Sequence, residues 1–432
     1  MAKSRESESC FMTHQIPQVE FITERKKFAA RREQTIDLLI RIVPPEPDPG
    51  IGRRPKLNLS MVLDRSGSMS GEKMDHARRA AMYCIDQLLS TDRISVVIFD
   101  DVVETLINSC LAENKSDLKE RISTIMARNS TALHEAWVRG GLQISQHLDS
   151  GAINRVLLIT DGLANVGLTN TDEIVSQSKG LAERGVSTST IGIGGDFNED
   201  LLLPMATAGG GNAWHVEHAD DMQRIFAVEL EGLIAQIGHS VSLGMIPSDG
   251  VRLVDVLNDF EMNENGRYKL PNLQAGSPIE VVVQLKLPAQ PAGMKMRLFD
   301  LRLGFTPQDR ASAEVIKHSF EIEFDTEESV SQLTANPEVA KAVRLLMNAR
   351  ARREAMKKLD TGDLVGSQQI IAQAVRATYV ACAPMASTPE VQQELEMLNN
   401  LSDELRGSEP RGMTRKKLSY QSYLRGRSKP LS

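Results

Sequence analysis

An alternation of apolar runs and amphipathic stretches between Leu57 and Ile237 is the feature that most limits how this chain can fold. Apolar runs bounded by Asp or Gly have the length and composition of buried strands: Leu57–Leu63, Ile94–Phe99, Val156–Thr160 and Ser187–Ile193. The stretches between and after them carry apolar residues at three-to-four spacing and predict helices: Glu72–Leu89, Ala132–Leu148, Asp172–Arg184 and Asp220–Ile237. Strands that alternate with helices form parallel βαβ units. Residues 53–238 are therefore predicted to be a doubly wound, mostly parallel α/β domain.

A different pattern flanks this unit on both sides. Residues 239–330 return to alternating apolar and polar positions, which is typical of an antiparallel β-sandwich. Residues 16–52 contain strand-like runs followed by a Pro-rich linker, because proline lacks the donor that a strand ladder needs. We expect the early strands to pair with the later sheet, so that the α/β unit is inserted into a β domain.

The remaining segments predict helices or no regular structure. Residues 331–406 carry apolar residues at helical spacing and predict a helical hairpin or bundle. Residues 1–15 lack periodicity and residues 407–432 are basic, so both are expected to be disordered. The basic tail is compatible with a solvated tail, a protein-docking peptide or a contact for nucleic acid or anionic lipid, and the sequence leaves these open.

Length, charge and cysteine usage exclude several classes of protein. A chain of 432 residues predicts more than one domain, at roughly 100–200 residues each. With 57 acidic and 50 basic residues the net charge is −7, which does not attract the whole molecule to nucleic acid. The four cysteines form no CxxC pair, and no apolar run has the length of a signal peptide or a membrane span. We predict a cytoplasmic protein with no membrane span and no specific nucleic-acid binding.

The most informative motif follows the first predicted strand of the α/β unit. Asp64, Ser66 and Ser68 form a DxSxS pattern in the turn between this strand and the next helix. The carboxyl ends of strands are where α/β sheets bind ligands. One carboxylate and two hydroxyls that alternate along a turn can converge on a hard cation such as Mg²⁺. The alternative is a plain helix N-cap, because Asp and Ser both favour that position.

Two further oxygen-bearing residues are expected at the same edge of the sheet. Thr131 opens a predicted helix, and Asp161 ends the apolar run Val156–Thr160 and precedes Gly162. Together with the DxSxS turn, this order of motifs resembles the metal-ion-dependent adhesion site of the von Willebrand factor A family. The resemblance covers roughly Leu57 to Gln236. It implies that Ser66, Ser68 and Thr131 bind the cation directly, while Asp64 and Asp161 act largely through water. The layout with flanking β segments also resembles bacterial relatives of the inter-α-trypsin inhibitor heavy chain.

The resemblance implies a non-catalytic protein–protein interaction module. A cation held by three weakly donating hydroxyls stays electrophilic, and in this family its open position takes an Asp or Glu carboxylate of a partner protein. The ion is Mg²⁺, Mn²⁺ or Ca²⁺, all of which prefer oxygen ligands. One alternative is a subunit that partners a AAA+ ATPase in trans. Another is a Mg²⁺-dependent phosphoryl-transfer enzyme, which is disfavoured because Ser66 stands where such enzymes need a second Asp as general acid.

Overall fold

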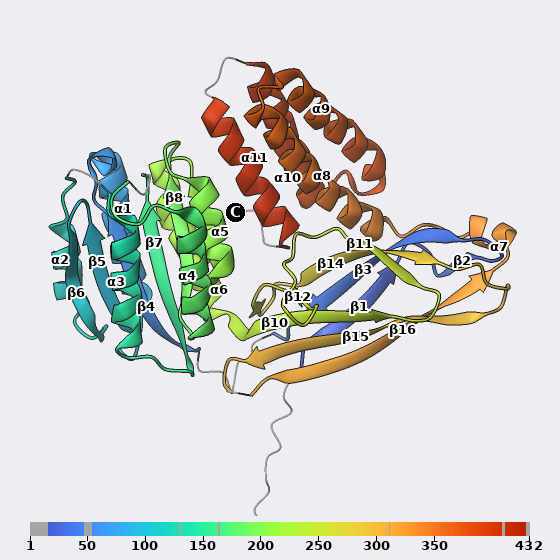
Figure 1. Ribbon diagram of the computed structural model, residues 1–432, viewed down its shortest axis with the longest axis horizontal. Helices are drawn as coiled ribbons and strands as arrows, with labels where there is room; N and C mark the ends of the chain where they lie inside the picture. Colours follow the sequence, from blue (N-terminus) through green and yellow to red (C-terminus); the bar gives the residue numbers. More distant parts are fainter. Residues whose placement is uncertain are drawn as a thin grey trace, which may run out of the picture.

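The computed structural model describes residues 16–46, 54–128, 131–162, 165–310, 312–407 and 411–428. Figure 1 shows an α/β unit at one end, a β-sandwich at the other and a group of helices above them. The predicted disorder of residues 1–15 and most of the Pro-rich linker lie outside the described residues. In the described part of the chain, no helix combines the length and the apolar character needed to cross a membrane.

The α/β unit is built on one mostly parallel sheet, which confirms the predicted fold class. Its strands are β4 (Lys56–Asp64), β5 (Arg93–Phe99), β6 (Val103–Leu111), β7 (Ala152–Thr160), β8 (Ser187–Ile193) and β9 (Gly210–Val216). They lie in the order β6-β5-β4-β7-β8-β9, and β6 alone in this sheet is antiparallel to its neighbour. Because β4 and β7 are central and parallel, their carboxyl ends meet at one edge of the sheet.

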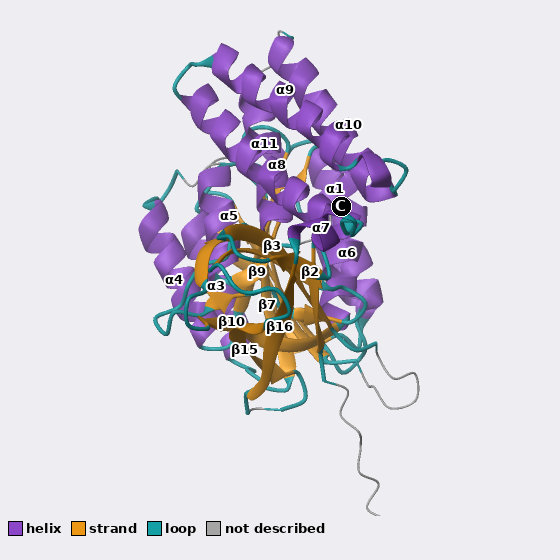
Figure 2. Cartoon of the chain, turned by 90° about the vertical axis from the view of Figure 1, so that its right-hand side faces the viewer, coloured by secondary structure: helices purple, strands orange, loops and turns teal. Residues whose placement is uncertain are grey.

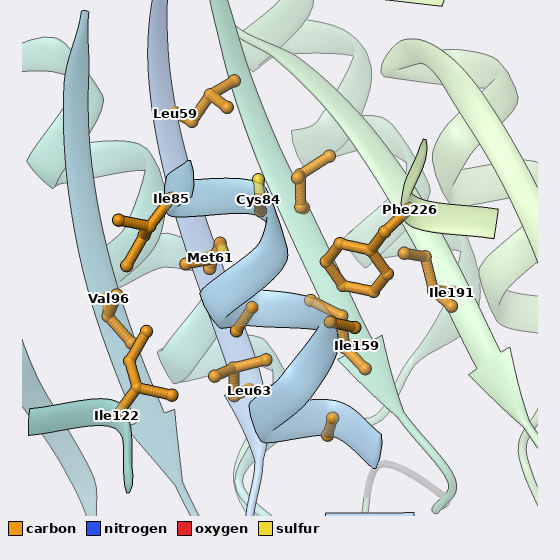
Figure 3. Close-up of a cluster of buried hydrophobic side chains, with 14 of the residues drawn as sticks. Leu59, Met61, Leu63, Cys84, Ile85, Val96, Ile122, Ile159, Ile191 and Phe226 are labelled. Carbon is orange, nitrogen blue, oxygen red and sulfur yellow. The ribbon is translucent and has the colours of Figure 1, made fainter. Parts of the chain in front are cut away.

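Helices cover both faces of this sheet. They are α1 (Glu72–Gln87), α2 (Lys115–Ser123), α3 (Leu133–Ser145), α4 (Thr171–Glu183), α5 (Glu199–Ala208) and α6 (Met222–Ile234), with short 3₁₀ turns η1 (Gly67–Met69) and η2 (Ala219–Asp221). Leu59, Met61 and Leu63 of β4 pack under α1 (Figure 3), whereas Val62 belongs to the core on the opposite face, with Trp137. Burial on both faces explains why β4 is an almost continuous apolar run rather than an alternating one.

The β-sandwich is assembled from strands on both sides of the α/β unit. Its strands are β1 (Gln18–Thr23), β2 (Lys27–Ala29), β3 (Gln34–Val43), β10 (Gln236–Pro247), β11 (Arg252–Val256), β12 (Tyr268–Lys269), β13 (Leu273–Gln274), β14 (Ile279–Leu287), β15 (Lys295–Pro307) and β16 (Glu314–Asp325). One sheet has the order β1-β3-β14-β11, and the other contains β12-β10-β15-β16-β2. Because β3 pairs along its length with β14, and β2 pairs with β16, the α/β unit is inserted between strands of the sandwich.

A helical unit follows the sandwich and lies beside both other units (Figure 2). Its helices are α8 (Pro337–Asp360), α9 (Leu364–Ala381), α10 (Pro389–Arg406) and α11 (Arg411–Gly426), with a short turn η3 (Ala383–Met385). The short helix α7 (Glu327–Ser331) packs instead beside β2 of the sandwich. The prediction that 407–432 is a disordered tail is wrong for the described part, because α11 is a helix that packs on α8, α10 and α5. Leu418, Tyr423 and Leu424 of this helix are buried. Its basic residues pair with acidic residues of α5, α8 and α10, and the local sequence holds no sign of these partners.

Candidate metal centre

Asp64 ends β4 as a fully buried carboxylate whose two oxygens are both hydrogen-bonded. Oδ1 accepts a hydrogen bond from the backbone N–H of Ser66 at 2.8 Å, and Oδ2 accepts one from Thr160 Oγ1 at 2.5 Å. Burial raises the pKa of Asp64 to about 6, against the lowering effect of the Thr160 and Ser66 hydrogen bonds, and the charge of Asp161 adds to the rise. The buried negative charge of the Asp64 carboxylate would therefore be stabilised by a positive charge bound beside it.

The two serine hydroxyls lie beside each other and reach towards β7. Ser66 Oγ is 3.1 Å from Ser68 Oγ, and Ser68 Oγ donates to Asp161 Oδ1 at 2.7 Å. Ser66 precedes η1 but makes no side-chain capping bond, and the N-cap of α1 is Gly71. The helix-cap alternative therefore does not describe these serines, whose hydroxyls contact each other and Asp161 at the carboxyl edge of the sheet.

Thr131 approaches the same space from the start of α3. A methyl group built on Gly162 would lie 3.4 Å from Thr131 Oγ1 and 3.6 Å from Asp64 Oδ2, so both oxygens border the small space that this glycine leaves open. The Thr131 backbone N–H donates to Asn165 Oδ1 at 3.2 Å, and Ala132 N–H donates to the Asp100 carbonyl at 2.7 Å. These bonds anchor the Thr131 loop to β5 and to the loop that follows β7.

Three side chains that sequence reasoning did not assign to the site complete it. Lys73, in the first turn of α1, places Nζ 2.5 Å from Asp161 Oδ2. Thr160 donates to Asp64 as described above, and buried Arg65 forms an ion pair with Asp100 at 3.0 Å. Arg65 and Thr160 each adjoin a motif carboxylate in the sequence, which is a signal that could have found them. For Lys73 no such signal exists, because a lysine on the first turn of a helix is ordinarily solvated.

The donors fit a hard divalent cation better than a transition metal that prefers nitrogen or sulfur. Two carboxylates and three hydroxyls are the oxygen ligands that Mg²⁺, Mn²⁺ and Ca²⁺ prefer. Within the described residues, no group of three or more His, Cys, Asp or Glu is arranged to hold a metal ion. Ser68 is exposed while Asp64 and Asp161 are fully buried, so one side of the cluster faces solvent.

Comparison with known families agrees with this arrangement. Residues 58–228 match the family model of the von Willebrand factor type A domain. The chain contains a von Willebrand factor type A (VWA) domain. The matched residues run from β4 to α6, so the VWA domain is the α/β unit that carries the candidate metal centre.

Two curated relatives are similar to part of this chain at low identity. The uncharacterized protein YfbK of Escherichia coli is 28% identical over 189 residues, which are 43% of this chain and 33% of YfbK. Human inter-alpha-trypsin inhibitor heavy chain H4 is 25% identical over 256 residues, or 56% of this chain and 27% of that protein. The matched segments thus span about a third or less of these two relatives.

Two solved structures share the whole architecture. A von Willebrand factor type A protein from Catenulispora acidiphila has a TM-score of 0.70 at 16% identity and covers 95% of this chain and 97% of its own. The ArnB paralog VWA2 from Sulfolobus acidocaldarius has a TM-score of 0.59 at 15% identity, covering 95% and 98%. The VWA domain, sandwich and helical unit therefore form a fold that other chains share.

Proposed function

We propose that this protein is a non-catalytic interaction module that binds an acidic side chain of a partner protein through a divalent cation held by its VWA domain. The carrying observation is the convergence of Asp64, Asp161 and three hydroxyl groups at the carboxyl edge of the sheet, with the Asp64 pKa raised by burial. Ser66, Ser68 and Thr131 would hold the ion, and Asp64 and Asp161 would orient them and balance its charge. The bound ion would supply an electrophilic position for a carboxylate oxygen.

Apolar side chains around the candidate centre support a protein partner. Val102 after β5, Met126 before Thr131, and Val166 after β7 are all exposed, on three loops that border the carboxyl edge of the sheet. Exposed apolar residues around a polar centre are typical of a contact surface. We expect the partner to present an Asp or Glu with an apolar side chain next to it.

The geometry of Asp64 supports a non-catalytic reading. A nucleophilic carboxylate needs an oxygen free to attack a phosphorus centre, whereas both oxygens of Asp64 accept hydrogen bonds and the side chain is fully buried. The residue two positions later is Ser66, which is a poor general acid near neutral pH. Phosphoryl transfer is therefore the weakest of the candidate activities.

Affinity capture with a ligand-deficient variant tests the proposal. Ser66→Ala/Ser68→Ala removes two hydroxyls, and we expect it to lose Mn²⁺ binding and to lose the partner that wild type retains in Mg²⁺ but releases in EDTA. Ser123→Ala/Thr124→Ala is the matched control, because these exposed hydroxyls donate only to carbonyls of α2. Recovery of a AAA+ ATPase would identify that class of partner. Equal capture by wild type and by the Ser66/Ser68 variant would overturn the proposal.

A further inference from the structure

The candidate metal centre already contains a positive charge of its own. Lys73 Nζ lies 2.5 Å from Asp161 Oδ2, while the other oxygen of Asp161 accepts the Ser68 hydroxyl. Among the described residues, Lys73 is the one cation that forms an ion pair with either site carboxylate. Arg65 is nearby, but its guanidinium is engaged by Asp100 and Glu104.

The position of Lys73 in α1 would not by itself stabilise the helix. It lies in the first turn of α1, where the helix dipole favours negative rather than positive side chains. Its side chain is 28% exposed, whereas Asp161 is fully buried, so the ammonium approaches the carboxylate from the solvent side. A methyl group on Gly194 at the end of β8 would lie 3.7 Å from Lys73 Nζ, so the ammonium is held between β7 and β8.

We propose that Lys73 is an internal counter-cation that competes with the divalent ion for Asp161. This inference rests on the proposed function and names a residue that tunes it. Without an ion, the ammonium neutralises a buried carboxylate and keeps it in place. With an ion bound, two positive charges share one carboxylate, and their repulsion in a partly buried site opposes binding. Because Lys73 is long and partly exposed, its ammonium can swing into solvent when the ion enters.

Two consequences follow for the centre. The protein tolerates the absence of metal, because Asp161 has a partner in that state. Monovalent cations gain little from replacing an ammonium of equal charge, so occupancy requires a divalent ion. Lys73 thus lowers cation affinity and makes the centre responsive to changes in divalent-ion concentration.

Cation binding to full-length variants tests this role. We expect Lys73→Met to bind Mn²⁺ about tenfold tighter or more than wild type, because the repulsion is removed, and Lys73→Arg to stay within about threefold of wild type. Lys119→Met is the matched control, because Lys119 is similarly exposed and pairs with Asp86 on the surface, far from the centre. Mn²⁺ titration by calorimetry or paramagnetic resonance gives the affinities without any partner.

Thermal melting supplies a second, independent measurement. Metal-free Lys73→Met should melt at a lower temperature than wild type, since Asp161 is left buried and unpaired, and saturating Mn²⁺ should remove most of that difference. Lys73→Gln serves if the methionine variant does not fold. If wild type binds Mn²⁺ and both Lys73→Met and Lys73→Gln bind it with equal or weaker affinity, this inference alone is overturned. Absence of Mn²⁺ binding in wild type and in both variants would overturn the proposed function with it.

Discussion

Two clusters of acidic side chains in this molecule are balanced in opposite ways. At the candidate metal centre, Asp64 and Asp161 are met by hydroxyls, a backbone N–H and one ammonium. At the second cluster, the α11 clasp, basic residues of α11 and α8 pair with acids of α5, α8 and α10. The clasp comprises Arg415, Lys416, Lys417, Arg425 and Arg352 with Glu199, Asp200, Asp360, Glu390, Glu394 and Glu404.

Opposite shifts in pKa record this difference. Burial alone would raise the pKa of Glu394, but the charges of Arg352 and Arg425 outweigh it and lower the pKa below its ordinary value. Glu199 is likewise lowered, because hydrogen bonds from Lys416 and Arg415 outweigh its burial. Asp64, which has no such partner, has its pKa raised. Acids that pair with guanidinium and ammonium groups in the clasp stabilise the fold, whereas Asp64, which accepts hydrogen bonds from a hydroxyl and a backbone N–H, is a carboxylate for which we propose a divalent cation as partner.

The largest effect is expected from an acid-to-amide change in the clasp. Glu394→Gln leaves buried Arg352 without a counter-charge and should lower the free energy of unfolding by about 3–5 kcal/mol. Urea denaturation followed by circular dichroism measures it. Glu396→Gln, on the exposed face of the same helix, should change little. A loss below about 1 kcal/mol for Glu394→Gln would show that Arg352 finds other partners.

The same chemical change at the metal centre should act differently. Asp64→Asn should weaken Mn²⁺ binding about 10- to 100-fold, as expected for a residue that orients metal ligands. It should not destabilise the metal-free protein at neutral pH, because it removes a buried charge that lacks a cationic partner. Calorimetric titration and urea denaturation give both quantities. A destabilisation as large as that of Glu394→Gln would erase the distinction between the two clusters.

Acidification should affect the two clusters in separate pH windows. The folded pKa of Asp64 is about 6 against 3.8 for an ordinary Asp, so the metal-free folded state binds more protons between these values. The metal-free protein should therefore become more stable to unfolding as the pH falls from about 6 to about 4, because Asp64 takes up a proton in the folded state. Mn²⁺ affinity should fall over the same range, because the protonated carboxyl no longer carries a negative charge. The lowered pKa values of Glu199 and Glu394 give stability that is present above 4.5 and is lost on further acidification. Mn²⁺ titrations and denaturation curves at several pH values measure both windows. If Mn²⁺ affinity and folding stability were lost over the same pH window, the comparison would be contradicted.

The smallest effect is expected at the rim of the α11 contact. Arg427 lies 3.5 Å from Glu261, whose side chain is 52% exposed. Arg427→Gln should lower the free energy of unfolding by less than about 1 kcal/mol, because exposed ion pairs are screened by water and salt. Denaturation at low and high salt measures it. A larger decrease in the free energy of unfolding that does not depend on salt would mean that stacking of Arg427 on Tyr423, rather than the ion pair, stabilises this contact.

The alternation of apolar and amphipathic segments was enough to predict the doubly wound sheet, because the spacing of apolar residues indicates which faces of a strand or helix are buried. The order of the DxSxS turn, Thr131 and Asp161 predicted which residues to look for at its carboxyl edge. Strands β6 and β9 were missed, since β6 is a partly exposed edge strand with polar residues and β9 begins with two glycines.

Charge pairing between distant segments was decided only by the tertiary structure. Residues 411–426 look like a solvated basic tail until Glu199, Asp360 and Glu404 are brought around them from three other helices. Lys73 is one more surface lysine in the sequence until β7 places Asp161 beside it. Local pattern determines which side chains turn towards a core, but the free energy of a charge depends on every charge that folding brings near it.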